Sequence, residues 1–124
     1  MANTTTTFPQ VLSATSLVGD EVCNSKGDKL GDIKELMIDL ERGRVAYAVL
    51  SFGGFMGLGD KLFAIPFSAL SLVPEEKHFV LDVPKERLEN APGFDKDNWP
   101  TISDRTWGAE IHRYYNAQPY WDAR

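Results

Sequence analysis

The stretch of the chain that most suggests chemistry is a glycine-rich run between two apolar segments. Gly54 and Gly59 have the spacing of the two glycines in a phosphate-binding P-loop. That motif continues with Lys and then Ser or Thr at the start of a helix, whereas Asp60 and Lys61 follow here and the next residues predict a strand. An aspartate at this place would also repel phosphate. We therefore expect these glycines to form sharp backbone turns and not a nucleotide site.

The residues that could carry out catalysis or bind a metal are few and scattered. His78 and His112 are the only histidines, neither lies in a metal-binding motif, and both are expected at the surface. Cys23 has no base near it in the sequence, which favours an inert, partly buried thiol. Asp28 and Asp32 flank a turn but lack the further oxygen ligands of a calcium loop. We expect no catalytic residue, no cofactor and no metal, and hence no enzyme.

Apolar side chains within the glycine-rich run are candidates for recognition. Phe55, Met56 and Leu58 either fold back and fill the end of the domain or form an exposed apolar tip. Methionine and aromatic residues are common at protein interfaces. We expect Leu58 to point inward and Phe55 and Met56 to lie at least partly outward, where they would contact a protein partner.

The C-terminal part of the chain is rich in large aromatic residues and includes all three tryptophans. One interpretation is that this segment packs on the outer face of an apolar strand at 45–52. The other is that it forms a dimer or partner interface, where Trp and Tyr are frequent anchors. Packing within the chain or its dimer is favoured, because so much aromatic area is costly to leave in water. The candidate partner-binding residues here are Trp107, Tyr114, Tyr115, Tyr120 and Trp121.

Length and charge restrict the class of protein. The 124 residues suit one domain with its own core, and 43% of them are hydrophobic. A net charge of -5 with scattered cations argues against a nucleic-acid partner, since phosphate binding needs a basic face. No run is long and apolar enough to span a bilayer, residues 1–10 do not resemble a signal peptide, and the lone cysteine fits a reducing compartment. These features together predict a cytoplasmic protein without a membrane span.

The pattern of short apolar runs predicts a mainly β fold. Strands are expected around residues 22–23 and at 33–40, 45–52, 61–65, 67–73 and 78–83. Leu36, Ile38 and Leu40 share one face of the second strand while Ile33 is out of phase, so a β-bulge is predicted near Lys34-Glu35. After Val83 the spacing changes to that of helices, first at 84–91 and then in a second helix capped by Ser103. Six short strands with tight turns predict a small barrel with helices only after it.

Several short motifs follow one another along the chain. They are GDEV at 19–22, Gly27, GDI at 31–33, Asp39, GRV at 43–45, FGGFMGLGDK at 52–61, IPFSAL at 65–70 and LENAP at 88–92. This ordered set resembles the PRC-barrel family over roughly Ser13 to Pro92. The resemblance implies a six-stranded PRC-type β-barrel and no catalytic residues. The division expected is a flexible N-terminus at 1–12, the barrel domain at 13–92 and an aromatic-rich helical tail at 93–124.

The functional expectation is a non-catalytic protein–protein interaction or regulatory module, acting as an adaptor whose partner is unidentified. A homodimer is an open alternative for the interface. The resemblance extends to the barrels of the photosynthetic reaction-centre H subunit and of a ribosome maturation factor. Two other functions therefore stay open, an accessory role in RNA processing or ribosome assembly, and an accessory role in photosynthetic electron transfer.

Overall fold

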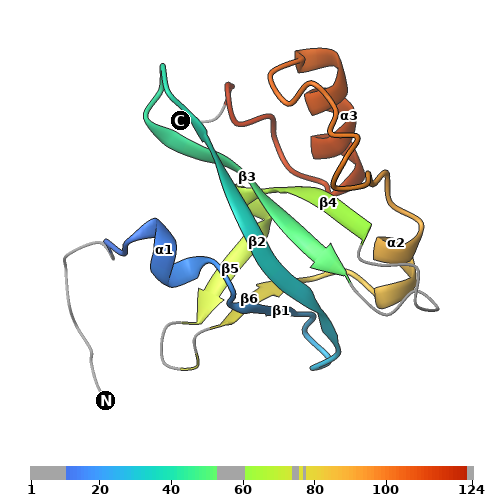
Figure 1. Cartoon of the computed structure of the whole chain (residues 1–124). Helices are drawn as coiled ribbons and strands as arrows, with labels where there is room; N and C mark the ends of the chain where they lie inside the picture. Colours follow the sequence, from blue (N-terminus) through green and yellow to red (C-terminus); the bar gives the residue numbers. More distant parts are fainter. Residues whose placement is uncertain (1–10, 53–60, 74–75, 77, 123–124) are drawn as a thin grey trace.

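The computed structural model describes residues 11–52, 61–73, 76 and 78–122, and shows a mainly β protein with helices at its ends (Figure 1). The strands are β1 (Glu21–Cys23), β2 (Lys29–Asp39), β3 (Arg44–Phe52), β4 (Lys61–Pro66), β5 (Leu70–Val73) and β6 (His78–Leu81). The helices are α1 (Ala14–Leu17), the 3-10 turn η1 (Phe67–Ala69), α2 (Lys85–Glu89) and α3 (Arg105–Tyr114). No helix in these ranges is long and apolar enough to cross a membrane.

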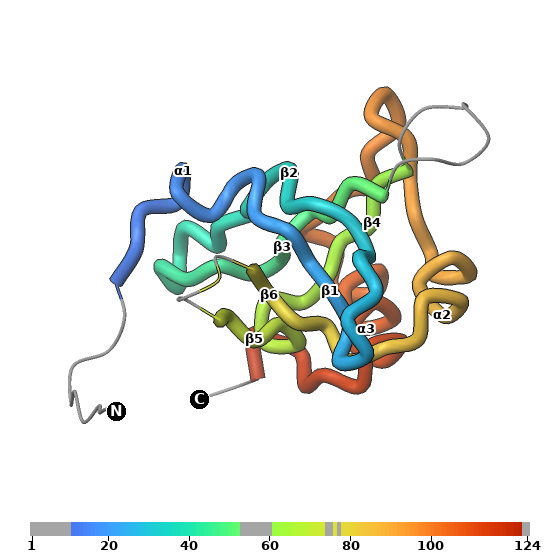
Figure 2. The backbone as a smooth tube through the Cα atoms, turned by 90° about the horizontal axis from the view of Figure 1, so that it is seen from below, coloured from blue at the N-terminus to red at the C-terminus, as the bar shows by residue number. Residues whose placement is uncertain are grey.

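The strands form one six-stranded sheet in the order β4-β3-β2-β1-β6-β5. Neighbouring strands are antiparallel except β1 and β6, which run parallel and bring Val22 beside Phe79. The sheet curls around its core as an open half-barrel (Figure 2). Within the described ranges the two edge strands, β4 and β5, do not pair with each other. The predicted fold class, a six-stranded PRC-type barrel with a C-terminal helical extension, is confirmed.

The long strand β2 is interrupted by two irregularities. Its pairing with β3 shifts between Ile33 and Glu35, which confirms the predicted bulge and brings Ile33 into the core. A second shift between Met37 and Ile38 was not predicted. The expectation that Ile38 and Leu40 share a face with Leu36 is therefore wrong: Leu36 packs against the core, whereas Ile38 and Leu40 are exposed.

The core lies inside the curled sheet and is closed at one end by the first helix after it. Its largest fully buried side chains include Leu30, Ile33, Leu50, Phe63 and Phe79. Leu88 of α2 is wholly buried among them. Buried and half-buried positions alternate along β6, but β3 and β4 are buried at nearly every position. A strand buried on both sides must be covered on both sides.

The outer side of β3 is covered by the C-terminal part of the chain. Tyr47 of β3 packs against Trp107 and His112 of α3 and against Tyr120 beyond it, with ring centroids 5.4, 5.4 and 5.8 Å away. Gly108 is what allows this close approach, because a Cβ there would lie 2.6 Å from the Tyr47 hydroxyl. The single glycine in α3 is thus explained by helix-to-strand packing.

Three further expectations need correction. Residues 67–69 form η1 and the fifth strand begins only at Leu70, so helical structure is not confined to the part after Val83. The cap of α3 is Asp104 and not Ser103, because the Asp104 carboxylate accepts from the main-chain N–H of Thr106 at 2.9 Å. His112, expected at the surface, is completely buried.

Candidate interaction groove

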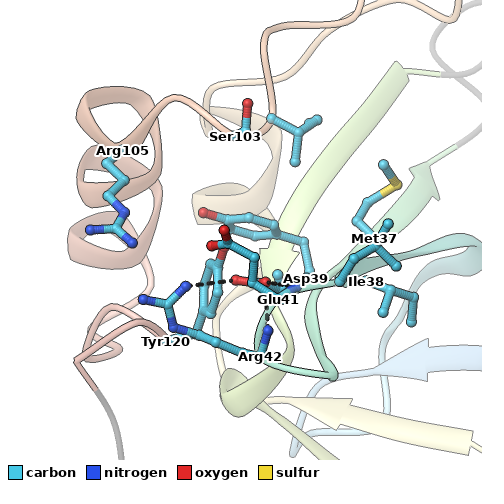
Figure 3. A pocket seen from close by; sticks show the side chains of 12 residues that line it. Met37, Ile38, Asp39, Glu41, Arg42, Ser103, Arg105 and Tyr120 are labelled. Atoms are coloured by element: carbon cyan, nitrogen blue, oxygen red, sulfur yellow. Dashed lines mark hydrogen bonds and ion pairs between the residues drawn. The ribbon is translucent and has the colours of Figure 1, made fainter.

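A groove opens between the β2–β3 hairpin and the C-terminal part of the chain (Figure 3). It has a volume of about 470 Å³. One wall comes from the end of β2 and the hairpin turn, and the other from the residues before α3 and from Tyr120. The residues that line it are Met37, Ile38, Asp39, Leu40, Glu41, Arg42, Ala46, Tyr47, Ile102, Ser103, Arg105 and Tyr120.

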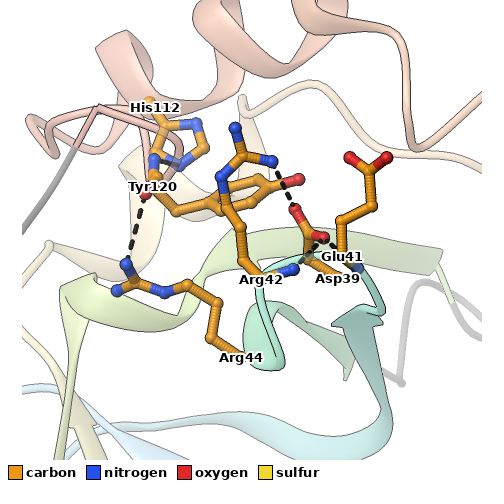
Figure 4. Close-up of polar contacts among 6 residues, drawn as sticks. All are labelled: Asp39, Glu41, Arg42, Arg44, His112 and Tyr120. Atoms are coloured by element: carbon orange, nitrogen blue, oxygen red, sulfur yellow. Dashed lines mark hydrogen bonds and ion pairs between the residues drawn. The ribbon is translucent and has the colours of Figure 1, made fainter.

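The hairpin wall is shaped by the carboxylate of Asp39. One oxygen of this carboxylate accepts from the main-chain N–H groups of Glu41 and Arg42 at 2.9 and 3.0 Å. The other accepts from the Arg42 guanidinium at 3.2 Å (Figure 4). Gly43 completes the turn at φ 65°, a left-handed conformation that favours glycine. The main-chain N–H of Arg42, followed by Tyr120 and the Arg42 side chain, lowers the pKa of Asp39 against a smaller desolvation effect.

Two large apolar side chains of this hairpin face solvent. Leu40 is 88% exposed at the turn, and Ile38 is 47% exposed at the edge of the groove. The second bulge of β2 rotates Ile38 away from the core, and Leu40 lies beyond the end of the strand, in the turn. Beside them the groove has an apolar floor of Met37, Ala46 and Tyr47. An apolar tip beside an apolar groove with charged margins is typical of a protein-binding surface.

The opposite wall is held in place through His112. Its Nδ1 lies 2.7 Å from the carbonyl oxygen of Gly108, and its Nε2 accepts from the main-chain N–H of Tyr120 at 3.2 Å. Arg44 donates to the carbonyl oxygen of Tyr120 at 3.3 Å, so β3 also holds this residue (Figure 4). Burial lowers the pKa of His112, and the contact with Gly108 opposes that effect. The pKa of Tyr120 is raised, first by desolvation and then by Asp39.

The structure places the five aromatic residues predicted from the tail in different surroundings. Trp107 and Tyr120 pack on Tyr47, and Tyr120 also lines the groove. Trp121 contacts the ring of His112 at 5.5 Å. Tyr115 is buried, while Tyr114 donates from its hydroxyl to the carbonyl oxygen of Arg87 at 2.6 Å. All five contact their own chain, and their role in partner binding stays a prediction.

Phe55, Met56 and Leu58 lie outside the described residues, so their proposed inward or outward orientation stays a prediction. The groove residues that sequence reasoning missed are Ile38, Asp39, Leu40 and Arg42. The exposure of Leu40 could have been predicted, because it lies between Asp39 and Glu41 in a tight turn, where its side chain cannot reach the core.

The side chains of the metal-ligating and nucleophilic types are dispersed among the described residues. In the parts of the chain that the structure covers, no three His, Cys, Asp or Glu side chains converge. The thiol of Cys23 is partly buried in β1, and burial, followed by the charge of Glu21, raises its pKa. A raised pKa keeps the thiol protonated, which makes it a poor nucleophile.

Comparison with known proteins agrees with the geometry of the sheet. The model of the PRC-barrel domain matches residues 9–88, more than half of the chain. The chain belongs to the PRC-barrel family. In this PRC-barrel protein the match covers the whole sheet and ends within α2, so α3 and Tyr120 lie beyond it. None of the curated proteins compared with the chain matches it. The groove is thus built jointly by the family domain and by a segment outside the family match.

Proposed function

We propose that this PRC-barrel protein is a non-catalytic interaction module that binds a protein partner through the groove and the hairpin tip. The observation that carries the proposal is the exposure of Ile38 and Leu40 beside the apolar floor of the groove. These two side chains contribute little to the core, and apolar surface of this kind is costly to leave in water. Membership of a family whose domain is of the interaction type supports the same conclusion.

The margins of the groove suit a polar rim around an apolar contact. Arg42 is held against Asp39, and the guanidinium of Arg105 lies over the ring of Trp121 at 5.2 Å. Both cations are therefore already positioned, which reduces the side-chain entropy lost on binding. A partner that inserts one or two apolar side chains between these walls, with acidic groups facing the two arginines, has the complementary chemistry.

The proposal is tested by capturing partners from the source cells with the tagged protein and with its Leu40→Glu variant. Leu40 makes no contribution to the core, so the variant is expected to fold normally and to lose the captured partner. Val11→Glu is the matched control, because Val11 is 87% exposed and lies away from the groove. Capture of the same partner by Leu40→Glu and by Val11→Glu in equal amounts would refute the proposed surface.

The same experiment separates the alternatives. Light scattering of the purified protein shows whether the occupant of the groove is a second copy, since Leu40→Glu would then shift a dimer to a monomer. RNA recovered with the protein, in amounts that fall with rising salt, would instead indicate the accessory role in RNA processing or ribosome assembly. The proposal includes a cytoplasmic location, which fractionation of the source cells tests.

A further inference from the structure

One buried histidine joins the C-terminal strap, here residues 117–122, to the rest of the protein. The N–H of Tyr120 can only donate, so Nε2 of His112 must accept and the ring proton must lie on Nδ1, which donates to the carbonyl of Gly108. His112 is 0% exposed, so water cannot replace either partner. The hydrogen bond between Tyr120 and His112 therefore requires the neutral ring.

Protonation of this ring would place a second N–H opposite the N–H of Tyr120. Two donors facing each other cannot form a hydrogen bond, and the added charge would be buried without a counter-ion. The groups around the ring do not relieve it. Tyr47 faces it from β3, Tyr120 and Trp121 face it from the strap, and within the described residues no carboxylate contacts it. The charged groups that contact these neighbours are Arg44, at the Tyr120 carbonyl, Arg105, over Trp121, and Asp39, whose carboxylate accepts from the Tyr120 hydroxyl. The Asp39 carboxylate is already paired with the guanidinium of Arg42.

The strap has few other attachments to the rest of the protein. Ala117 donates from its N–H to the carbonyl oxygen of His112 at 2.9 Å, Arg44 donates to the carbonyl oxygen of Tyr120, and the Tyr120 hydroxyl donates to the carboxylate of Asp39. The Asp122 N–H bonds only to Pro119 within the strap. Tyr120 and Trp121 are only partly buried. A segment with so few bonds can open while the sheet stays folded.

We propose that His112 is a pH-sensitive clasp whose protonation releases Tyr120 and the strap from α3 and β3. Release removes Tyr120 from the wall of the groove, so acidification opens the groove on that side. The clasp itself is independent of what the groove binds. Its effect on a partner rests on the proposed function above.

The direct test is amide hydrogen exchange of the wild-type protein followed by NMR from about pH 7.5 to about pH 5.5. The Tyr120 amide reports strap opening, because its acceptor is His112 itself. The amide of Val49, in the buried strand β3, reports global unfolding. After correction for intrinsic exchange, the opening constant at Tyr120 is expected to rise about tenfold per unit fall of pH below about 6.5. Tyr120 must also remain less protected than Val49 throughout.

The variant His112→Gln supplies an amide donor and acceptor that do not titrate. The pH dependence at Tyr120 is expected to disappear in it, and to persist in the control His78→Gln at the other histidine. Tyr120 protection that is independent of pH in the wild type, or equal to that of Val49 at every pH, would overturn the clasp. The comparison of Tyr120 with Val49 is made in the wild-type protein, so it tests the clasp even if His112→Gln does not fold. A clasp that titrates while partner capture is unaffected by pH would leave the clasp standing and count against the groove as the binding surface.

Discussion

The two sides of β3 are both buried, but the side chains that cover them differ in type. On the inner side, Leu50 pairs in register with Ile33 and Phe63, and all three are apolar and almost completely buried. On the outer side, Tyr47 meets the rings of Trp107, His112 and Tyr120. The hydroxyl of Tyr47 is buried there without a hydrogen-bond partner among the described residues. The inner contact is built within the matched family domain, and the outer one with residues beyond it.

The two contacts of β3 therefore differ in how their contribution to stability depends on pH. An apolar contact has no group that titrates near neutral pH, so its contribution does not change with mild acidification. The outer contact contains the buried ring of His112 and the Tyr47 hydroxyl, which has no hydrogen-bond partner among the described residues. Burial of each polar group reduces the net stabilisation, and the contribution of His112 also depends on pH. The inner side holds the sheet together, and the outer side can respond to conditions.

The largest effect is expected from shortening Leu50 on the inner side. Leu50→Ala leaves a cavity in the core and is expected to lower the free energy of unfolding by about 2–5 kcal/mol. The loss should be the same at about pH 7.5 and about pH 5.5, as measured by denaturant titration. A cost below about 1 kcal/mol would show that the inner side is not the stabilising one.

A smaller loss is expected from adding a methyl group to α3. The Cβ of Gly108→Ala would lie 2.6 Å from the Tyr47 hydroxyl and 3.0 Å from Trp121, and overpacking of this kind costs about 1–3 kcal/mol. The better helix propensity of alanine offsets up to about 1 kcal/mol of that cost. In the background of Tyr47→Phe the nearest clashing atom is gone, so the cost of Gly108→Ala should fall. A cost that is unchanged by Tyr47→Phe would mean that Trp121, not Tyr47, fixes the approach of the helix.

Acidification should weaken the outer side through His112. Near neutral pH the ring is uncharged in the folded and the unfolded chain. Below about pH 6.5 the unfolded chain binds a proton that the buried ring does not, because the folded pKa is lowered. The free energy of unfolding therefore falls with pH, by at most about 1.4 kcal/mol per pH unit, until the folded pKa is reached. His112→Gln should reduce this slope, which denaturant titration at several pH values measures.

The smallest effect is expected from removing one oxygen on the outer side. Tyr47→Phe deletes a buried hydroxyl that has no partner among the described residues, so stability should stay within about 1 kcal/mol of the wild type and can rise. Thermal unfolding measures the change. A loss above about 2 kcal/mol would show that the hydroxyl has a partner in solution, such as a buried water.

The sequence allowed the sheet to be predicted better than the groove, for a physical reason. Strand phase is local, so the mismatch of Ile33 was enough to predict the first bulge. The second bulge could not be predicted, since Ile38 is in phase with Leu36 and nothing local distinguishes an exposed position from a buried one. His112 appeared to be an ordinary helix-flank residue. Its burial depends on Tyr47 and on Tyr120, which only the folded chain brings to it.

The parallel pairing of β1 with β6 has a consequence for the order of events during synthesis. The strands β2, β3 and β4 can pair as successive hairpins soon after each is made, because their contacts are local in sequence. The outer edge of β1, in contrast, waits for residues 78–80, which are made more than fifty positions later. Until then the nascent chain carries an unpaired strand edge beside Val22, a feature that promotes wrong association. The brevity of β1, only three residues long, limits that exposure to a short edge.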